Sequence, residues 1–138
     1  MFKTPNFQKA KTPSNLKVSN IKAAPQDLEE RFNQFFERVI KLCKKCPINA
    51  TTSRIISQLI GCGGSIPANY AEASEAMSKK DFVKSIKIIR KESKESIVWL
   101  RGLKLVVEFD DSEFDALIQE ATEFIYILTS ILKKTDKK

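Results

Sequence analysis

Residues 78–107 read SKKDFVKSIKIIRKESKESIVWLRGLKLVV, and this stretch decides the fold class. Ser78 followed by Asp81 has the form of a capping box, with Asp in place of the usual Glu, so we expect a helix to begin there. Steps of three and four residues then separate the apolar and small side chains, a spacing that places them along one side of an α-helix. These positions are Phe82, Ile86, Ile89, Ser93, Ser96, Leu100, Leu103 and Val107.

The same helical period occurs twice before this stretch. A first helix should begin after Asp27 and end near Cys46-Pro47, because a proline disfavours helical geometry in the residue before it. Its apolar positions are Leu28, Phe32, Phe35, Val39, Leu42 and Cys46. A second helix has its stripe at Ile55, Leu59, Cys62, Ile66, Asn69, Ala73 and Met77. Three glycines and Pro67 fall within residues 61–67, so we expect a kink or a close helix contact there.

A fourth helix should follow Ser112, its expected N-cap, and end at Lys133-Lys134, where basic residues are favoured. Its apolar positions are Phe114, Ile118, Ala121, Ile125, Leu128 and Leu132. Only 4 Gly and 5 Pro are present, which leaves few turns for a many-stranded sheet. The pattern therefore predicts an all-α, up-and-down four-helix bundle over residues 27–134.

The two ends of the chain differ from the bundle in composition. Residues 1–26 contain the word Lys-Thr-Pro twice and no acidic residue. They have too few apolar side chains to offset the entropy of ordering them, so we expect a flexible basic arm. Its lysines are Lys3, Lys9, Lys11, Lys17 and Lys22. Residues 135–138 form a short basic tail.

The composition argues against an enzyme and against a bound metal or cofactor. The chain has no His, which removes the commonest general base and a usual metal ligand. Its 3 Cys cannot all pair within one chain, and we expect free thiols in a reducing cytoplasm. Cys43 and Cys46 form a C-x-x-C half-site without a second half, so we interpret them as core or helix-end residues. No signal peptide and no apolar run of ~18 residues is visible, so we expect no membrane association.

Polar residues on the second and third helices allow two interpretations. Asn69 falls on the apolar stripe, where its amide would need hydrogen-bond partners. The favoured interpretation is a hydrogen-bonded polar layer that fixes the helix register. A carboxylate metal site is the alternative, but di-iron bundles use Glu-x-x-His pairs and this chain has no His. The residues concerned are Asn69, Glu72, Glu92 and Glu95.

The third helix carries a second, partly apolar side. Ile88, Glu92, Glu95 and Trp99 follow one another at steps of 4, 3 and 4, away from the Phe82 to Val107 stripe. Only one of the two sides can face the core of its own bundle. We therefore expect Trp99 and Val106 to belong to an interface between subunits.

The third helix also carries a line of cations, here called the basic row. It consists of Lys80, Lys84, Lys87, Lys91, Lys94 and Arg101. The row extends over roughly 30 Å at 1.5 Å per residue. Like charges at these spacings repel, so something negative should face them. One candidate is the acidic segment 105–132, with seven acids and no base, in the same subunit or an adjacent one. The other is the phosphate backbone of RNA or DNA, assisted by the basic arm.

Taken together, five short segments resemble the four-helix bundle protein family, also described as 23S rRNA intervening-sequence proteins. They are residues 58–60 (QLI), 65–73 (SIPANYAEA), 78–82 (SKKDF), 91–96 (KESKES) and 99–101 (WLR). The resemblance covers about residues 30–134 and extends to accessory variability proteins of diversity-generating retroelements. Two features depart from it, namely Pro67, where Gly or Ala is frequent, and the length of the basic arm.

The resemblance implies properties that the residue pattern alone does not. It implies a ring-like homo-oligomer, typically a homopentamer, without known catalytic activity. It also implies that Asn69, Glu72 and Glu95 are characteristic positions of the family. In the retroelement relatives, the basic outer surface engages nucleic acid and a reverse transcriptase. We therefore expect a non-enzymatic accessory protein that binds nucleic acid, RNA preferred, and alternatively a protein scaffold without nucleic-acid binding.

Overall fold

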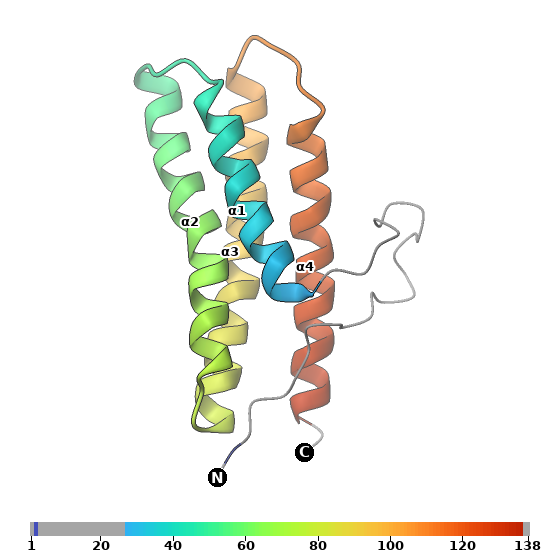
Figure 1. Ribbon diagram of the computed structural model, residues 1–138. Helices are drawn as coiled ribbons and strands as arrows, with labels where there is room; N and C mark the ends of the chain where they lie inside the picture. The colour runs from blue at the N-terminus through green and yellow to red at the C-terminus, as the bar shows by residue number, and fades with distance from the viewer. Residues whose placement is uncertain (1, 3–26, 137–138) are drawn as a thin grey trace.

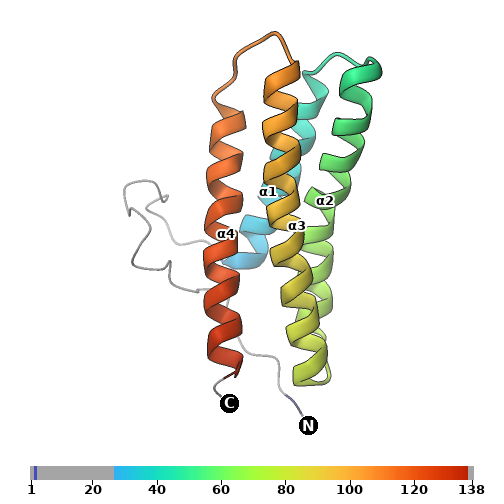
Figure 2. The same cartoon turned by 180° about the vertical axis from the view of Figure 1, so that it is seen from behind.

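The structure, a computed structural model, describes residue 2 and residues 27–136. It contains four helices: α1 (Leu28–Lys44), α2 (Ala50–Ser74), α3 (Lys79–Val106) and α4 (Glu113–Asp136). The helices run up and down beside one another, joined by short loops (Figure 1). α3 packs against α2 and α4, and α1 packs against the same two helices, so α1 and α3 lie diagonally opposite (Figure 2). The predicted all-α, four-helix architecture is confirmed.

The ends of the chain can be compared with the prediction only in part. The predicted arm lies outside the described residues except for Phe2, whose ring centroid lies 5.9 Å from that of Phe82 at the start of α3. At the other end, α4 continues to Asp136, two residues beyond the predicted end of the bundle at residue 134. The rest of the predicted basic tail, residues 137–138, lies outside the described residues.

Side-chain caps begin α1 and α3 where the sequence predicts them. The Asp27 carboxylate accepts a hydrogen bond of 2.7 Å from the backbone N–H of Glu30. The Ser78 hydroxyl accepts one of 3.1 Å from the N–H of Asp81. Such a cap satisfies a backbone donor that has no partner in the first turn and contributes about 1 kcal/mol.

No cap was predicted for α2, and at α4 the capping side chain differs from the predicted one. Asn49 and Thr52 form a reciprocal capping box that begins α2. At α4, Ser112 directly precedes the first helical residue, as predicted, but the capping side chain is that of Asp111, whose carboxylate accepts a hydrogen bond of 2.9 Å from the N–H of Glu113. An ionised carboxylate is a stronger acceptor than a hydroxyl, which favours Asp111 at this helix start.

Aromatic rings join α1 to α4 in the core. The Phe32 and Phe124 rings meet edge to face with centroids 4.7 Å apart, and Phe35 lies 5.4 Å from the same Phe124 ring. All three side chains are completely buried. Edge-to-face pairs add about 0.5–1.5 kcal/mol each to the stabilisation from burial. The predicted stripes of α1 and α3 are buried at every position, which confirms them.

The stripes of α2 and α4 were predicted less well. In α2, Ile56 and Tyr70 are buried, whereas the predicted neighbours Ile55 and Asn69 are only half-buried. Met77 is 67% exposed because α2 ends at Ser74, so the helical period does not extend to it. In α4, the predicted Ile118 and Ile125 are half-buried, while the positions directly before them, Leu117 and Phe124, are buried. The stripe of each helix is therefore rotated by about one residue in places.

The close helix contact predicted within residues 61–67 is confirmed at Gly64. A Cβ atom at this position would lie 3.0 Å from the tip of the Phe36 ring on α1. At Gly63, the nearest atom to such a Cβ would be Val39 Cγ1, at 3.6 Å. The missing side chains therefore let α1 approach α2, and α2 continues as one helix through Pro67.

Candidate nucleic-acid interface

The basic row lies on the exposed side of α3. All six of its side chains are exposed, whereas the stripe from Phe82 to Leu103 is buried against the other helices. The steps of 4, 3, 4, 3 and 7 keep the row within an arc of about 100° of the helix circumference. Because α1 lies diagonally opposite (Figure 2), the row, whose side chains are exposed, faces away from the bundle. The arm lysines Lys3, Lys9, Lys11, Lys17 and Lys22 lie outside the described residues.

Most ion pairs of the acidic residues in α4 and in the α3–α4 loop are made with α1 or with the α1–α2 loop. Arg31 binds Glu120 and Glu123, and Arg38 binds Glu113 at 2.7 Å. Lys45 binds Asp111 at 2.9 Å. The ion pair from α3 is that of Lys104 with Asp115, 2.8 Å apart, and Lys104 lies outside the basic row. Among the described residues, no ion pair joins a carboxylate to the row, so the candidate in which the acidic segment of the same subunit pairs with the row is not seen, and the candidate of an adjacent subunit stays a prediction.

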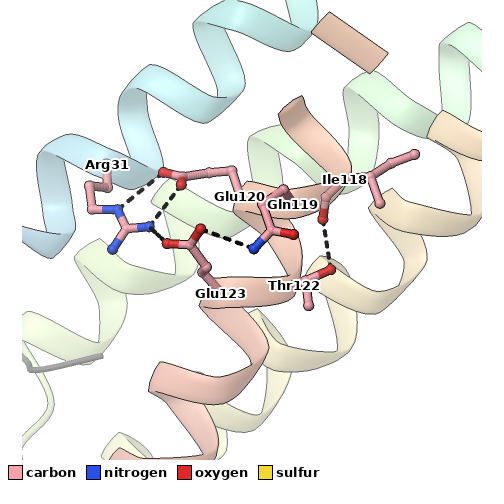
Figure 3. Close-up of polar contacts among 6 residues, drawn as sticks. All are labelled: Arg31, Ile118, Gln119, Glu120, Thr122 and Glu123. Atoms are coloured by element: carbon pink, nitrogen blue, oxygen red, sulfur yellow. Dashed lines mark hydrogen bonds and ion pairs between the residues drawn. The ribbon is translucent and has the colours of Figure 1, made fainter. Parts of the chain in front are cut away.

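Arg31 is the centre of the most buried of these contacts (Figure 3). Its Nη2 atom lies 2.8 Å from Glu120 Oε1 and 3.0 Å from Glu123 Oε1, and its Nε donates to Glu120 Oε2 at 3.1 Å. Gln119 Nε2 donates to the second oxygen of Glu123 at 3.3 Å. The Glu123 residue is 2% exposed. Its charge is therefore held in the core by Arg31 and by one amide.

The electrostatics of the two arginines differ. Burial opposes the charge of Arg31, but hydrogen bonds and attraction from Glu120 and Glu123 outweigh it and raise the pKa of Arg31. Arg38 is less buried, and its hydrogen bond lowers the pKa of the Glu113 carboxyl below its ordinary value. Arg38 thus favours the ionised form of Glu113, and both arginines bind α4 carboxylates from α1.

The α1–α4 pairing was missed in the sequence, although a signal for it exists. Arg31 and Arg38 are seven residues apart on α1, and Glu113 and Glu120 are seven residues apart on α4. Seven residues are two helical turns, so each pair lies on one side of its helix. In antiparallel helices the first arginine must then meet the second glutamate, as the structure shows. Matched spacing of opposite charges would have indicated this register.

Comparison with known proteins decides the family. The model of the 23S rRNA-intervening sequence protein family matches residues 27–130, which include α1 to α3 and most of α4. The chain belongs to the 23S rRNA-intervening sequence protein family. This confirms the resemblance inferred from the sequence.

A solved structure supports the same assignment. The fold is similar to the crystal structure of a protein with unknown function from the S23 ribosomal protein family of Bacteroides thetaiotaomicron. The TM-score is 0.65 and the sequence identity 27%, over 76% of this chain and 97% of that one. No curated protein matches the chain. In the present chain, none of the described helices has the length and apolar character that a membrane span requires.

Three of the four residues predicted to form the polar layer lie in one cluster between α2 and α3. Asn69 Nδ2 donates to the carbonyl oxygen and to the hydroxyl of Ser65, both at 2.8 Å. The Ser65 hydroxyl also bonds the Glu92 carboxyl, which in turn bonds Glu95. Burial, together with Glu95, raises the pKa of Glu92. Glu72 is exposed and lies outside this cluster, and no His, Cys, Asp or Glu group in the described residues could hold a metal ion.

The apolar side chains of α3 are distributed differently from the prediction. Trp99 and Val106 are half-buried and pack against the core of their own bundle. The exposed apolar residues of α3 are Val98 and Leu105, which are 61% and 83% exposed and continue the line of the basic row. Leu105 also lines a shallow groove between α3 and α4 with Arg101. The subunit interface at Trp99 and Val106 stays a prediction.

The cysteines lie in the core, as interpreted from the sequence. Cys43, Cys46 and Cys62 are free and buried. Burial raises the pKa of Cys43 to about 12, with Cys46 contributing. Burial raises the pKa of Cys62 as well, although the Ser96 hydroxyl hydrogen bonds to its sulfur at 3.3 Å. Thiols with raised pKa values are poor nucleophiles at neutral pH, so these residues serve packing.

Proposed function

We propose that this protein is a non-enzymatic, homo-oligomeric accessory protein that binds nucleic acid, with RNA preferred, through the basic row. The observation that carries the proposal is that the six cations of the row are exposed while the α4 acids are paired elsewhere. A surface of this kind attracts a polyanion. The family resemblance supplies the other parts of the proposal: a homopentamer, and a partner such as a ribonucleoprotein or a reverse transcriptase.

The energetics of α3 favour an anionic ligand. From Lys80 to Lys94, the row contains four pairs of neighbouring lysines, each pair separated by three or four residues. Each such pair of like charges costs an isolated helix about 0.2–0.5 kcal/mol, or on the order of 1–2 kcal/mol for the four. Phosphates along the row would remove this repulsion. Release of counterions from the nucleic acid would add the main part of the binding free energy.

A charge-reversal experiment tests the proposal. Lys87→Glu together with Lys91→Glu places two acids in the middle of the row and should abolish RNA binding in a filter assay at low salt. Lys41→Glu together with Arg54→Glu is the matched control, because it changes the net charge equally at exposed positions outside α3. Both variants should keep the helical circular dichroism of the wild type. Absent or salt-independent RNA binding by the wild type would reject the proposal.

An oligomeric protein scaffold is the second candidate, and a specific observation favours it. Val98 and Leu105 are exposed on the same line as Arg101, and exposed aliphatic residues on a helix are suited to a protein contact. If the row were covered by such a contact, the Lys87→Glu and Lys91→Glu changes would lower the stability of the oligomer. Affinity for nucleic acid would then be negligible in the wild type as well. Light scattering beside the filter assay distinguishes the two candidates.

A further inference from the structure

The chemistry of the exposed side of α3 restricts what the basic row can recognise. From residue 84 to residue 105, this side consists of six cations and two aliphatic residues. They are Lys84, Lys87, Lys91, Lys94, Val98, Arg101, Lys104 and Leu105. Over this span the exposed side offers no aromatic ring and no amide side chain. Stacking on unpaired bases needs an aromatic ring, and bidentate recognition of adenine needs an amide side chain.

Trp99 does not supply the missing ring. It lies seven residues after Glu92, whose carboxyl bonds Ser65 of α2, so Trp99 lies on the α2 side of α3. The side chain is half-buried and packs against the core. It therefore belongs to the bundle and does not form a platform beside the lysines.

An interface that contributes charge alone ranks its ligands by charge density. Double-stranded nucleic acid carries one negative charge per ~1.7 Å of its axis, against ~3.4 Å for each of its strands. Resting on the proposed function, we infer that the basic row binds the phosphate backbone of double-stranded nucleic acid, without regard to sequence, in preference to single strands. Phosphate contacts fix the position of a protein on a duplex but carry no sequence information.

The expected preference can be estimated from the salt dependence of binding. If all six cations of the row meet phosphates, the slope of log K against log salt is about −5 for a duplex and about −4 for a single strand. If duplex and single strand bind equally at 1 M salt, this difference in slope corresponds to about tenfold tighter binding of the duplex at 0.1 M salt. The row is also long enough, at roughly 30 Å, to meet phosphates of both strands of a duplex.

The test compares four fluorescent 20-nucleotide RNA probes on the full-length protein at 0.1 M salt. Two are duplexes of unrelated sequence and two are the corresponding single strands. We expect both duplexes to bind equally and about tenfold tighter than either strand. The Lys87→Glu and Lys91→Glu variant should lose the affinity for all four, which assigns binding to the row. The fluorescence emission of Trp99, the single tryptophan of the chain, should not change when the protein is saturated with a probe.

The outcomes separate this inference from the proposed function. Single strands that bind as tightly as duplexes, or duplexes whose affinities differ by about tenfold or more, overturn the inference and leave nucleic-acid binding intact. Quenching of Trp99 by single strands also overturns it, because a base would then stack on the ring. Failure of all four probes to bind at low salt overturns the proposed function itself. Duplex DNA of the same sequences shows whether the sugar contributes to binding.

Discussion

Arg38 on α1 holds Glu113 on α4 in a two-point ion pair, with Nη2 at 2.7 Å and Nε at 2.9 Å from the two carboxylate oxygens. Arg31 holds Glu120 in the same way, two helical turns away on both helices. Because Arg31 and Arg38 of α1 bind these carboxylates, few acidic residues of α4 remain to pair with α3. The six cations of the basic row lie on the side of α3 that faces away from the bundle, and this difference between the diagonal helices α1 and α3 underlies the proposed function.

Removal of Arg31 should destabilise the bundle strongly. Arg31→Ala leaves the Glu123 carboxylate, 2% exposed as a residue, with one amide donor and no counter-charge. Breaking a buried pair in this way costs about 3–5 kcal/mol. The free energy of unfolding, measured in urea, should fall by that amount. A loss below about 1 kcal/mol would show that Glu123 finds water or another partner.

A compensating variant separates buried charge from lost packing. Arg31→Met with Glu120→Gln and Glu123→Gln removes the whole ion network while keeping side chains of similar size. We expect this triple variant to be clearly more stable than Arg31→Ala, because replacing a buried ion group with uncharged side chains is often close to neutral. Equal stability of the two variants would mean that packing by the Arg31 side chain dominates.

The Arg38–Glu113 pair should make stability depend on acidity. Its hydrogen bond lowers the pKa of Glu113, so its stabilisation is present above the ordinary Glu pKa of about 4.3 and lost as the pH falls through the lowered value. Arg38→Gln should be less stable than the wild type at pH 7, and the gap should be smaller at pH 3. Arg54→Gln, at an exposed position, is the control. An equal gap at both pH values contradicts the assignment.

At Glu92, the pH dependence of stability should have the opposite sign. Burial, together with Glu95, raises its pKa, so folding becomes less favourable as the pH rises from the ordinary Glu pKa through that raised value. Glu92→Gln should therefore raise the urea midpoint at pH 7 and leave it unchanged at acidic pH, where Glu92 is neutral in both states. Glu72→Gln is the control because Glu72 is exposed. A lower midpoint for Glu92→Gln at pH 7 would indicate that the carboxylate is needed for the contact with Ser65.

Two glycines of α2 should respond differently to alanine. A Cβ at Gly61 meets nothing within 4 Å, so Gly61→Ala should stabilise the protein by about 0.5–1 kcal/mol through helix propensity. A Cβ at Gly64 would lie 3.0 Å from the Phe36 ring, so Gly64→Ala should gain less or destabilise. Thermal unfolding of the two variants gives the comparison. A larger gain at Gly64 would show that Phe36 moves away freely.

The sequence predicted those parts of the fold that depend on one helix at a time. The α1 and α3 stripes follow a regular period, and Asp27 and Ser78 are local caps, so all of these could be read from the residues nearby. The phase of α2 was less certain because glycines weaken its pattern. Exposure of the basic row was also predictable, since lysine side chains at helical spacing rarely lie in a core.

The features that sequence reasoning missed depend on two helices at once. Glu123 was treated as part of an acidic segment, because its burial becomes favourable only when Arg31 lies opposite. Trp99 packs beside the core of its own bundle, which its position away from the Phe82 stripe did not indicate, and its place in a subunit interface stays a prediction. The pairing of α1 with α4 therefore decides which partners the α4 acids have.

Lysine modification on the assembled protein tests the central claim most directly. Acetylation with a water-soluble reagent, read by mass spectrometry, reports whether Lys84, Lys87, Lys91 and Lys94 are accessible in the oligomer. We expect these four to react in the free protein and to be protected by duplex RNA, while exposed Lys41 and Lys133 react equally in both samples. Unreactive row lysines in the free protein, or no protection by RNA, would contradict the account.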